Sequence, residues 1–231
     1  MPGFTLGTAR WPEVEAGPRR LLVVPLGSLE QHGPHLPMDT DTRIACCVAA
    51  RACGGRAGVG LAPPVAIGAS GEHADFPGTL SIGTVALSAL LVELGRHASL
   101  HWPAMLLVNG HGGNGPAITG AVSRLRDEGR ECDVWHAGLG PGAGDAHAGR
   151  TETSLMLALA PSEVLLDRAV AGDTRPIAEL LPGLRAHGVR KVSPNGVLGD
   201  PAGASAAEGE QLLAQLVRGL NAKLDKLRTD V

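Results

Sequence analysis

The sequence predicts an α/β fold, in which helices cover a mostly parallel β-sheet. Short apolar runs alternate along the chain with stretches that carry apolar residues at helical spacing. The chain has 231 residues, of which 44% are hydrophobic and 19% charged, so it can bury the core of one sizeable domain. It contains no internal repeat and no linker. We therefore expect residues 1–231 to form a single domain.

The first part of the chain contains two predicted strands. LLVVPLG (21–27) reads as a buried strand, and a helix is expected near 40–53. VGLAPPVAIG (59–68) is a second strand, which is interrupted because Pro63–Pro64 cannot donate hydrogen bonds to a sheet. These prolines indicate an edge strand, a bulge or an exit from the sheet.

The same alternation continues through the rest of the chain. The expected elements are a helix over 84–100, a central strand over 104–110, a helix near 116–128, a strand near 131–136 and a helix near 152–159. Four prolines within 171–204 predict irregular structure there. The last segment, 205–227, has the apolar spacing of an amphipathic helix.

Charge and composition exclude several classes of function. The formal net charge is -3 and there is no basic block, so we expect no nucleic-acid partner. No apolar run approaches the roughly 18 residues that a membrane span needs, and the first residues lack the pattern of a secretory signal. We therefore expect a cytoplasmic protein with no membrane partner. The four cysteines form no C-x-x-C pair and are interpreted as small buried hydrophobic residues.

Side chains that can bind metals follow the predicted strands. Ligands of open parallel sheets bind beyond the carboxyl ends of the strands. Glu30 and His32 follow the strand 21–27, and their spacing points both side chains the same way in an extended segment. His111 directly follows the strand 104–110. We expect these side chains to lie near one another.

Two further segments add carboxylates and a histidine to this edge. Asp39 and Asp41 stand at the start of the next helix, and spacing alone does not decide between them, although Asp39 also fits a helix N-cap. His147 and Glu152 are expected on a loop that follows the strand near 131–136. Imidazole and carboxylate ligands suit zinc, manganese or iron. Two such ions can share a carboxylate and lower the pKa of a bridging water toward neutrality, which favours amide hydrolysis.

The glycine-rich loop around His111 has a second interpretation. Gly110-x-Gly112-x-x-Gly115 matches a dinucleotide-binding pattern, and Asp133 lies near the expected distance downstream. This interpretation predicts a nicotinamide or flavin oxidoreductase, but it leaves the metal-capable residues of the other loops without a function. A metal-dependent scaffold without catalytic activity is a third hypothesis.

Three motifs together resemble the creatininase family of metal-dependent amidohydrolases, and they appear in the family's order. They are GSLEQHGPHLPMDTD (27–41), VNGHGGN (108–114) and DAHAGRTETS (145–154). The resemblance implies a three-layer α/β/α fold, two divalent metal ions (zinc, iron or manganese) and a homo-oligomer. Further segments resemble the corresponding segments of a group of family members. These members remove a short C-terminal dipeptide from a modified precursor peptide during maturation of a redox cofactor. These segments are GEH (71–73), LSIGT (80–84) and GVLGDPAGASAAEG (196–209).

The resemblance also implies roles for individual residues. The residues taken as metal ligands are Glu30, His32, Asp41, His111 and Glu152. Among these, Asp41 is implied as the bridge between the two ions. His147 is implied as the proton donor to the leaving amine.

The substrate pocket departs from the pattern of creatinine-cleaving members. Creatinine-cleaving members resemble the pattern Asn-Gly-His-aromatic-Glu. This chain instead has Gly112 and Gly113 directly after His111. Small planar rings are usually held by aromatic faces, yet this chain has no Tyr, two Phe and three Trp. We expect His73, Gly112 and Gly113 to line a pocket for a peptide tail. Creatinine or another cyclic amide is the alternative substrate.

Overall fold

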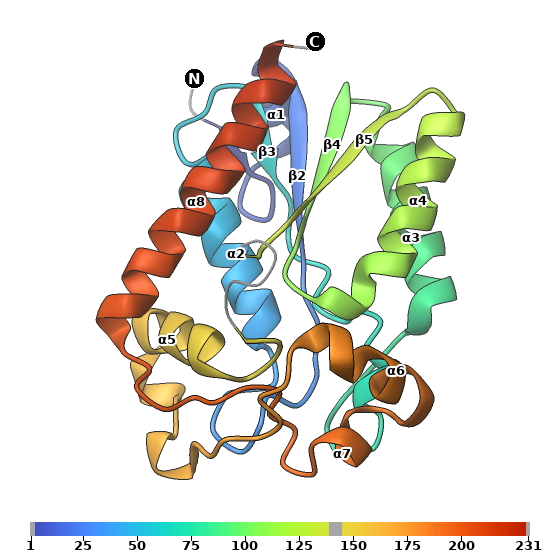
Figure 1. The fold of residues 1–231 in the computed structure, drawn as a ribbon. Coiled ribbons are helices and arrows are strands. Elements are labelled where there is room, and N and C mark those ends of the chain that lie inside the picture. The colour runs from blue at the N-terminus through green and yellow to red at the C-terminus, as the bar shows by residue number, and fades with distance from the viewer. Residues whose placement is uncertain (1–2, 139–144, 230–231) are drawn as a thin grey trace.

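The computed structural model describes residues 3–138 and 145–229. Its centre is a five-stranded sheet in which every described pair of strands is parallel, in the order β1-β3-β2-β4-β5 (Figure 1). The strands are β1 (Phe4–Thr5), β2 (Leu21–Leu26), β3 (Val59–Leu61), β4 (Ala104–Asn109) and β5 (Glu131–His136). The predicted α/β fold with a parallel sheet is confirmed.

Helices cover both faces of this sheet (Figure 1). On one face lie α2 (Thr40–Cys53), α5 (Arg150–Leu159) and α8 (Ala206–Thr229), and on the other lie α3 (Gly83–Ala98) and α4 (Gly115–Asp127). Successive side chains of β2 alternate between two buried apolar clusters: Val23 packs with the first group of helices and Val24 with the second. This is the three-layer α/β/α arrangement that the resemblance implied.

The second predicted strand is shorter than expected. β3 ends before Pro63–Pro64, so the prolines mark an exit from the sheet. The edge-strand alternative was wrong, because β3 lies between β1 and β2. Beyond the prolines, Val65 returns to form a single bridge with Leu26.

The prediction of irregular structure for 171–204 was wrong in part. This segment contains α6 (Ile177–His187) and the short α7 (Val189–Val192). Pro176 stands directly before α6, where its fixed φ suits the start of a helix, and Pro182 lies inside the helix. The structure also adds β1 and α1 (Trp11–Ala16), which the sequence did not indicate, and the short 3-10 turns η1 (Gly71–His73), η2 (Gly112–Asn114), η3 (Pro161–Glu163) and η4 (Leu166–Arg168).

The strand ends determine where a site can form. Leu26 pairs with Asn109, and Asn109 pairs with His136, so β2, β4 and β5 end at the same level. The loops that follow them therefore start at one edge of the sheet. Among the described residues, no helix has the length and hydrophobicity that crossing a membrane requires.

Candidate metal centre

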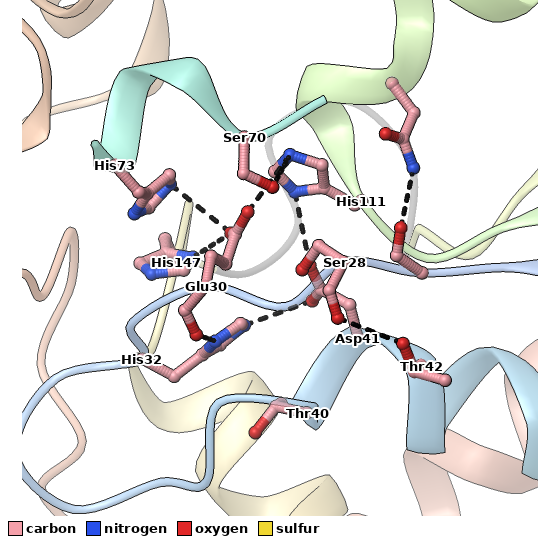
Figure 2. Close-up of polar contacts among 12 residues, drawn as sticks. Ser28, Glu30, His32, Thr40, Asp41, Thr42, Ser70, His73, His111 and His147 are labelled. Carbon is pink, nitrogen blue, oxygen red and sulfur yellow. Dashed lines mark hydrogen bonds and ion pairs between the residues drawn. The ribbon is translucent and has the colours of Figure 1, made fainter. Parts of the chain in front are cut away.

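A cluster of buried polar side chains lies beyond this edge of the sheet (Figure 2). It combines the loop after β2, the first turn of α2, η1, the loop after β4 and the segment before α5. Its central members are Glu30, His32, Asp41, His73, His111 and His147. The structure therefore brings together side chains that the sequence placed at separate strand ends.

Asp41 lies between two histidines. Its Oδ1 is 3.1 Å from Nε2 of His32, and its Oδ2 is 3.2 Å from Nδ1 of His111. Ser28 donates a hydrogen bond from Oγ to Oδ2 at 2.7 Å, which fixes the carboxylate. The two oxygens thus face different partners, as a carboxylate shared by two ions would.

Glu30 is fully buried, and neither of its carboxylate oxygens has a hydrogen bond within the described structure. Oε2 lies 3.1 Å from Nε2 of His111, while Oε1 lies 3.3 Å from Nε2 of His73 and 3.7 Å from Nδ1 of His147. A buried carboxylate without hydrogen bonds is costly unless a charge compensates it. Glu30 therefore has the environment of a cation ligand.

Potential ligand atoms gather in three overlapping groups. Within each group, one atom per residue lies within 4.8 Å of the others. The groups are Glu30 with Asp41 and His111, His32 with Asp41 and Glu152, and Glu30 with His32 and His147. Asp41 belongs to the first two groups, so it is the carboxylate positioned to join them.

Glu152 lies in the first turn of α5, not on the preceding loop as the sequence indicated. Its Oε2 accepts a hydrogen bond from the backbone N–H of Ala148 at 2.6 Å and lies 3.9 Å from Nε2 of His32. The start of this helix thus turns the carboxylate toward the cluster.

Three histidines share a hydrogen-bonding pattern. Each ring donates one N–H to a main-chain carbonyl: His32 Nδ1 to Glu30 O at 3.0 Å, His111 Nε2 to Ala69 O at 3.2 Å, and His147 Nε2 to Gln31 O at 2.8 Å. Because a carbonyl only accepts, the nitrogen that faces it carries a proton in each ring, and the opposite nitrogen faces the cluster and can bind a cation when it is not protonated. Metal-ligating histidines are oriented in this way, so the donor set fits a metal ion.

The charges of the cluster shift several pKa values. Burial acts to raise the pKa of Asp41, but the charges of His32 and His111 hold it well below its usual value. Burial likewise opposes ionisation of Glu30, yet His111 lowers its pKa to about 2. Both carboxylates therefore stay ionised at neutral pH, the form that binds cations.

Burial changes the pKa values of His147, His32 and Glu152 in different ways. Burial, followed by the charges of His32 and His73, lowers the pKa of His147 well below its usual value, so this ring is neutral. Burial acts to lower the pKa of His32, but the nearby Asp41 raises it to about 10. Burial raises the pKa of Glu152 to about 7.

The three predicted pocket residues lie in different surroundings. His73 is buried within the cluster. A Cβ on Gly113 would lie 2.3 Å from Oε1 of Glu72 and 2.4 Å from Nε2 of His111, so only glycine fits there. A Cβ on Gly112 would meet no atom within 4 Å. Open space thus begins at Gly112.

The dinucleotide interpretation of the glycine motif has no support in this geometry. His111, inside the motif, faces the carboxylate of Asp41. Asp133 instead forms ion pairs with Lys223 of α8 and with Arg126. The expected ribose-binding carboxylate is therefore already paired on another surface.

Two residues contribute in ways that the sequence did not indicate. Asp39 occupies the N-cap position of α2 but makes no side-chain cap; it accepts a hydrogen bond from Arg43 instead. Gln31 lies between the metal-capable Glu30 and His32 in the sequence, and its buried amide contacts His73 and His147. No spacing rule could have revealed a contact between positions 31 and 147.

Comparison with known proteins identifies the family. The sequence model for creatininase, described as creatinine amidohydrolase, matches residues 7–224. The chain belongs to the creatininase family. A mycofactocin precursor peptide peptidase from Mycolicibacterium smegmatis is 52% identical over 216 residues, which cover 91% of this chain and 86% of the relative.

Solved creatininase structures have the same fold. A glutamate-to-glutamine variant described as the Zn-Zn type aligns with a TM-score of 0.79 at 27% identity and covers 98% of each chain. A creatininase structure described with Mn aligns with a TM-score of 0.73 at 27% identity, covering 97% of this chain and 98% of that one. As a creatininase-family member, the chain is a hydrolase of carbon–nitrogen bonds with candidate metal-binding groups.

Proposed function

We propose that this protein is a metal-dependent peptidase that removes a short C-terminal dipeptide from the modified precursor peptide of mycofactocin biosynthesis. The observation that carries the proposal is the pair of ligand groups that share Asp41 at the sheet edge. The substrate is supported by the high identity with the mycobacterial peptidase.

We propose that the centre holds two divalent ions, which are zinc, iron or manganese. Glu30, Asp41 and His111 would hold one ion, and His32, Asp41 and Glu152 the other. The Glu30 carboxylate, which has no hydrogen bond in the described structure, and the ring nitrogens of His32 and His111 that face the cluster support this occupancy. Bound divalent cations polarise a carbonyl group and lower the pKa of coordinated water.

His147 would carry the proton during peptide cleavage. Its Nε2–H donates a hydrogen bond to Gln31 O. Nδ1 is therefore the nitrogen that can accept a proton, and it faces Glu30 in the cluster. Water adds to the peptide carbonyl carbon and the carbon–nitrogen bond breaks. Nδ1 accepts the proton that the water loses and passes it to the departing amine nitrogen, giving a carboxylic acid and an amine.

The open space at Gly112 favours a peptide over a compact ring. Neither Gly112 nor Gly113 provides a side chain that could hold a planar substrate. This supports the peptide tail over creatinine or another cyclic amide.

Mass spectrometry of the precursor peptide tests this function. The purified, metal-loaded protein should shorten the modified precursor by its two terminal residues, and a chelator should stop the reaction without unfolding the chain. An intact precursor after prolonged incubation with metal-loaded protein would contradict the proposal.

His147→Gln separates proton transfer from metal binding. We expect this variant to keep its metal and to lose about 10²–10⁴-fold in rate, the usual contribution of a positioned acid–base group. Elemental analysis and the same mass-spectrometric assay measure the two quantities. A parental rate in this variant would reassign the proton carrier.

We also propose that residues 1–231 form one unit that acts in the cytoplasm. Both ends of the described chain pack on the same sheet, since β1 pairs with β3 and α8 packs on the face that holds α2. All four cysteines are free thiols, which is usual in a reducing compartment.

A further inference from the structure

The side chain of Gln31 is held in one orientation by two main-chain partners. Its Oε1 accepts a hydrogen bond from Gly33 N–H at 2.8 Å, and its Nε2 donates to Gly196 O at 2.9 Å. Because a backbone N–H only donates and a carbonyl only accepts, the two ends of the amide are distinguished. A Cβ on Gly196 would lie 1.8 Å from Oε1 of Gln31, so the main chain packs directly on this amide.

The second hydrogen of the amide has two histidines within reach. Nε2 of Gln31 lies 2.9 Å from Nδ1 of His73 and 3.1 Å from Nε2 of His147. His147 Nε2 already donates its proton to Gln31 O at 2.8 Å, so it cannot accept another. The amide hydrogen therefore goes to His73 Nδ1.

This bond determines which nitrogen of His73 carries the proton. With Nδ1 accepting, the neutral ring is protonated at Nε2, and Nε2 lies 3.3 Å from Oε1 of Glu30. His32, His111 and His147 each have a main-chain carbonyl as the partner of one ring nitrogen, whereas the amide N–H of Gln31 contacts His73 and leaves its Nε2–H on the side of Glu30. Were His73 the other tautomer, its lone pair would repel the Glu30 carboxylate.

We infer that Gln31 is a positioning residue, which holds His73 with its Nε2–H turned toward Glu30. In this arrangement His73 turns one oxygen of Glu30 toward itself and leaves the other, Oε2, on the side of His111. Outer residues that orient a ligating carboxylate strengthen metal binding, and their loss typically costs about 10–100-fold in affinity. The effect on metal binding rests on the proposed function, but the tautomer of His73 is a property of the chain alone.

The tautomer is measured by NMR. In protein labelled with ¹⁵N-histidine, long-range ¹H–¹⁵N correlations should show His73 protonated at Nε2, with Nδ1 as a hydrogen-bonded acceptor. Gln31→Met keeps the length of the side chain but removes the donor, so the Nδ1 signal should lose its hydrogen-bonded shift. A His73 ring protonated at Nδ1 in the parent protein would overturn the inference.

Zinc titration then tests the effect on the centre. Gln31→Met and His73→Phe should each lower zinc affinity about 10–100-fold, and the double variant should lose no more than the single ones, because both break the same chain of contacts. His73→Gln places an amide N–H near the position of Nε2 and should recover part of the affinity. Gln215→Met, exposed on α8, is the matched control and should bind zinc like the parent.

The outcomes separate this inference from the proposed function. Two results would overturn the role of Gln31. One is a parental zinc affinity in Gln31→Met, and the other is a loss of zinc affinity in the double variant that equals the product of the losses in the two single variants. Failure of the protein to cleave the precursor peptide would count against the proposed function and leave the NMR and zinc results unaffected.

Discussion

Asp41 faces His32 with one carboxylate oxygen and His111 with the other. Because it belongs to two ligand groups, Asp41→Ala removes a ligand from both proposed metal positions, whereas Glu152→Ala affects one. We expect Asp41→Ala to be purified with little metal and Glu152→Ala with about half the parental content, on the scheme of two ions that share one carboxylate. Elemental analysis of metal per protein chain measures both.

Asp39 provides the matched control for this experiment. It lies two residues before Asp41 at the start of the same helix, but its carboxylate pairs with Arg43 at 2.7 Å. Asp39→Ala should keep the full metal content. Parental metal content in Asp41→Ala would remove Asp41 from the proposed ligands.

The sequence predicted part of this residue-level picture. Family motifs favoured Asp41 over Asp39, and the geometry places Asp41, not Asp39, among the histidines. The contacts of Gln31 and Ser28 could not be predicted, because both depend on the exact positions of partners from other segments. Gln31 reaches His147 across 116 residues of sequence, a relation that no local spacing encodes.

At the level of single elements, α8 is held by a stripe of buried leucines. Leu213, Leu216, Leu220 and Leu224 recur every three or four residues and pack against the face that holds α2 and α5. Leu220→Ala should lower the free energy of unfolding by about 2–5 kcal/mol, because it leaves a cavity in this layer. Urea unfolding measures the change.

The exposed Arg218 on the same helix is the control for this substitution. Arg218→Ala should change the free energy of unfolding by about 0.5 kcal/mol or less. Equal stability of Leu220→Ala and the parent would show that α8 does not depend on this stripe.

The buried cysteines of α2 and β5 should be unreactive in the folded protein. Burial raises the pKa of Cys53 and of Cys132 to about 11, so near pH 8 both remain thiols, and the thiolate is the reactive form. Iodoacetamide at pH 8 should leave them unmodified until urea unfolds the chain, as read by peptide mass spectrometry. Rapid labelling of Cys132 in the native protein would contradict its burial.

Element boundaries followed from the sequence where apolar periodicity was strong. Thr40–Cys53 was predicted with the bounds that the structure has, and the strands β2, β4 and β5 lie within a residue of their predicted limits. Helix α6 was missed because prolines usually indicate loops, whereas Pro176 precedes this helix and Pro182 is tolerated within it. The two residues of β1 are too few to produce a periodic signal.

At the scale of the whole molecule, α3 leaves apolar side chains in solvent. Val85 is 86% exposed and Leu90 is 40% exposed on the same helix. Copies of the chain that associate through α3, as in the homo-oligomer that the family resemblance implied, would bury these side chains. Val85→Glu should shift the protein to a smaller species in sedimentation velocity.

A charge change elsewhere on α3 controls for nonspecific effects. Glu93→Gln should sediment like the parent, since Glu93 pairs with Arg96 within the helix. A parent protein that sediments as a monomer would contradict association through this face.

The layering of the molecule was predictable, whereas the order of its strands was not. Alternating strands and helices require a covered parallel sheet, because each crossover places a helix on one face. Nothing in the sequence specifies that β3 inserts between β1 and β2, since that order depends on pairings between distant segments.

The separation of the clustered residues along the chain has a consequence for biosynthesis. Glu30 and His32 leave the ribosome long before His147 and Glu152, so the early part of the nascent chain lacks the side chains that complete the ligand groups. The proposed metal positions are therefore complete only once Glu152 has been synthesised and α5 has packed against the rest of the fold.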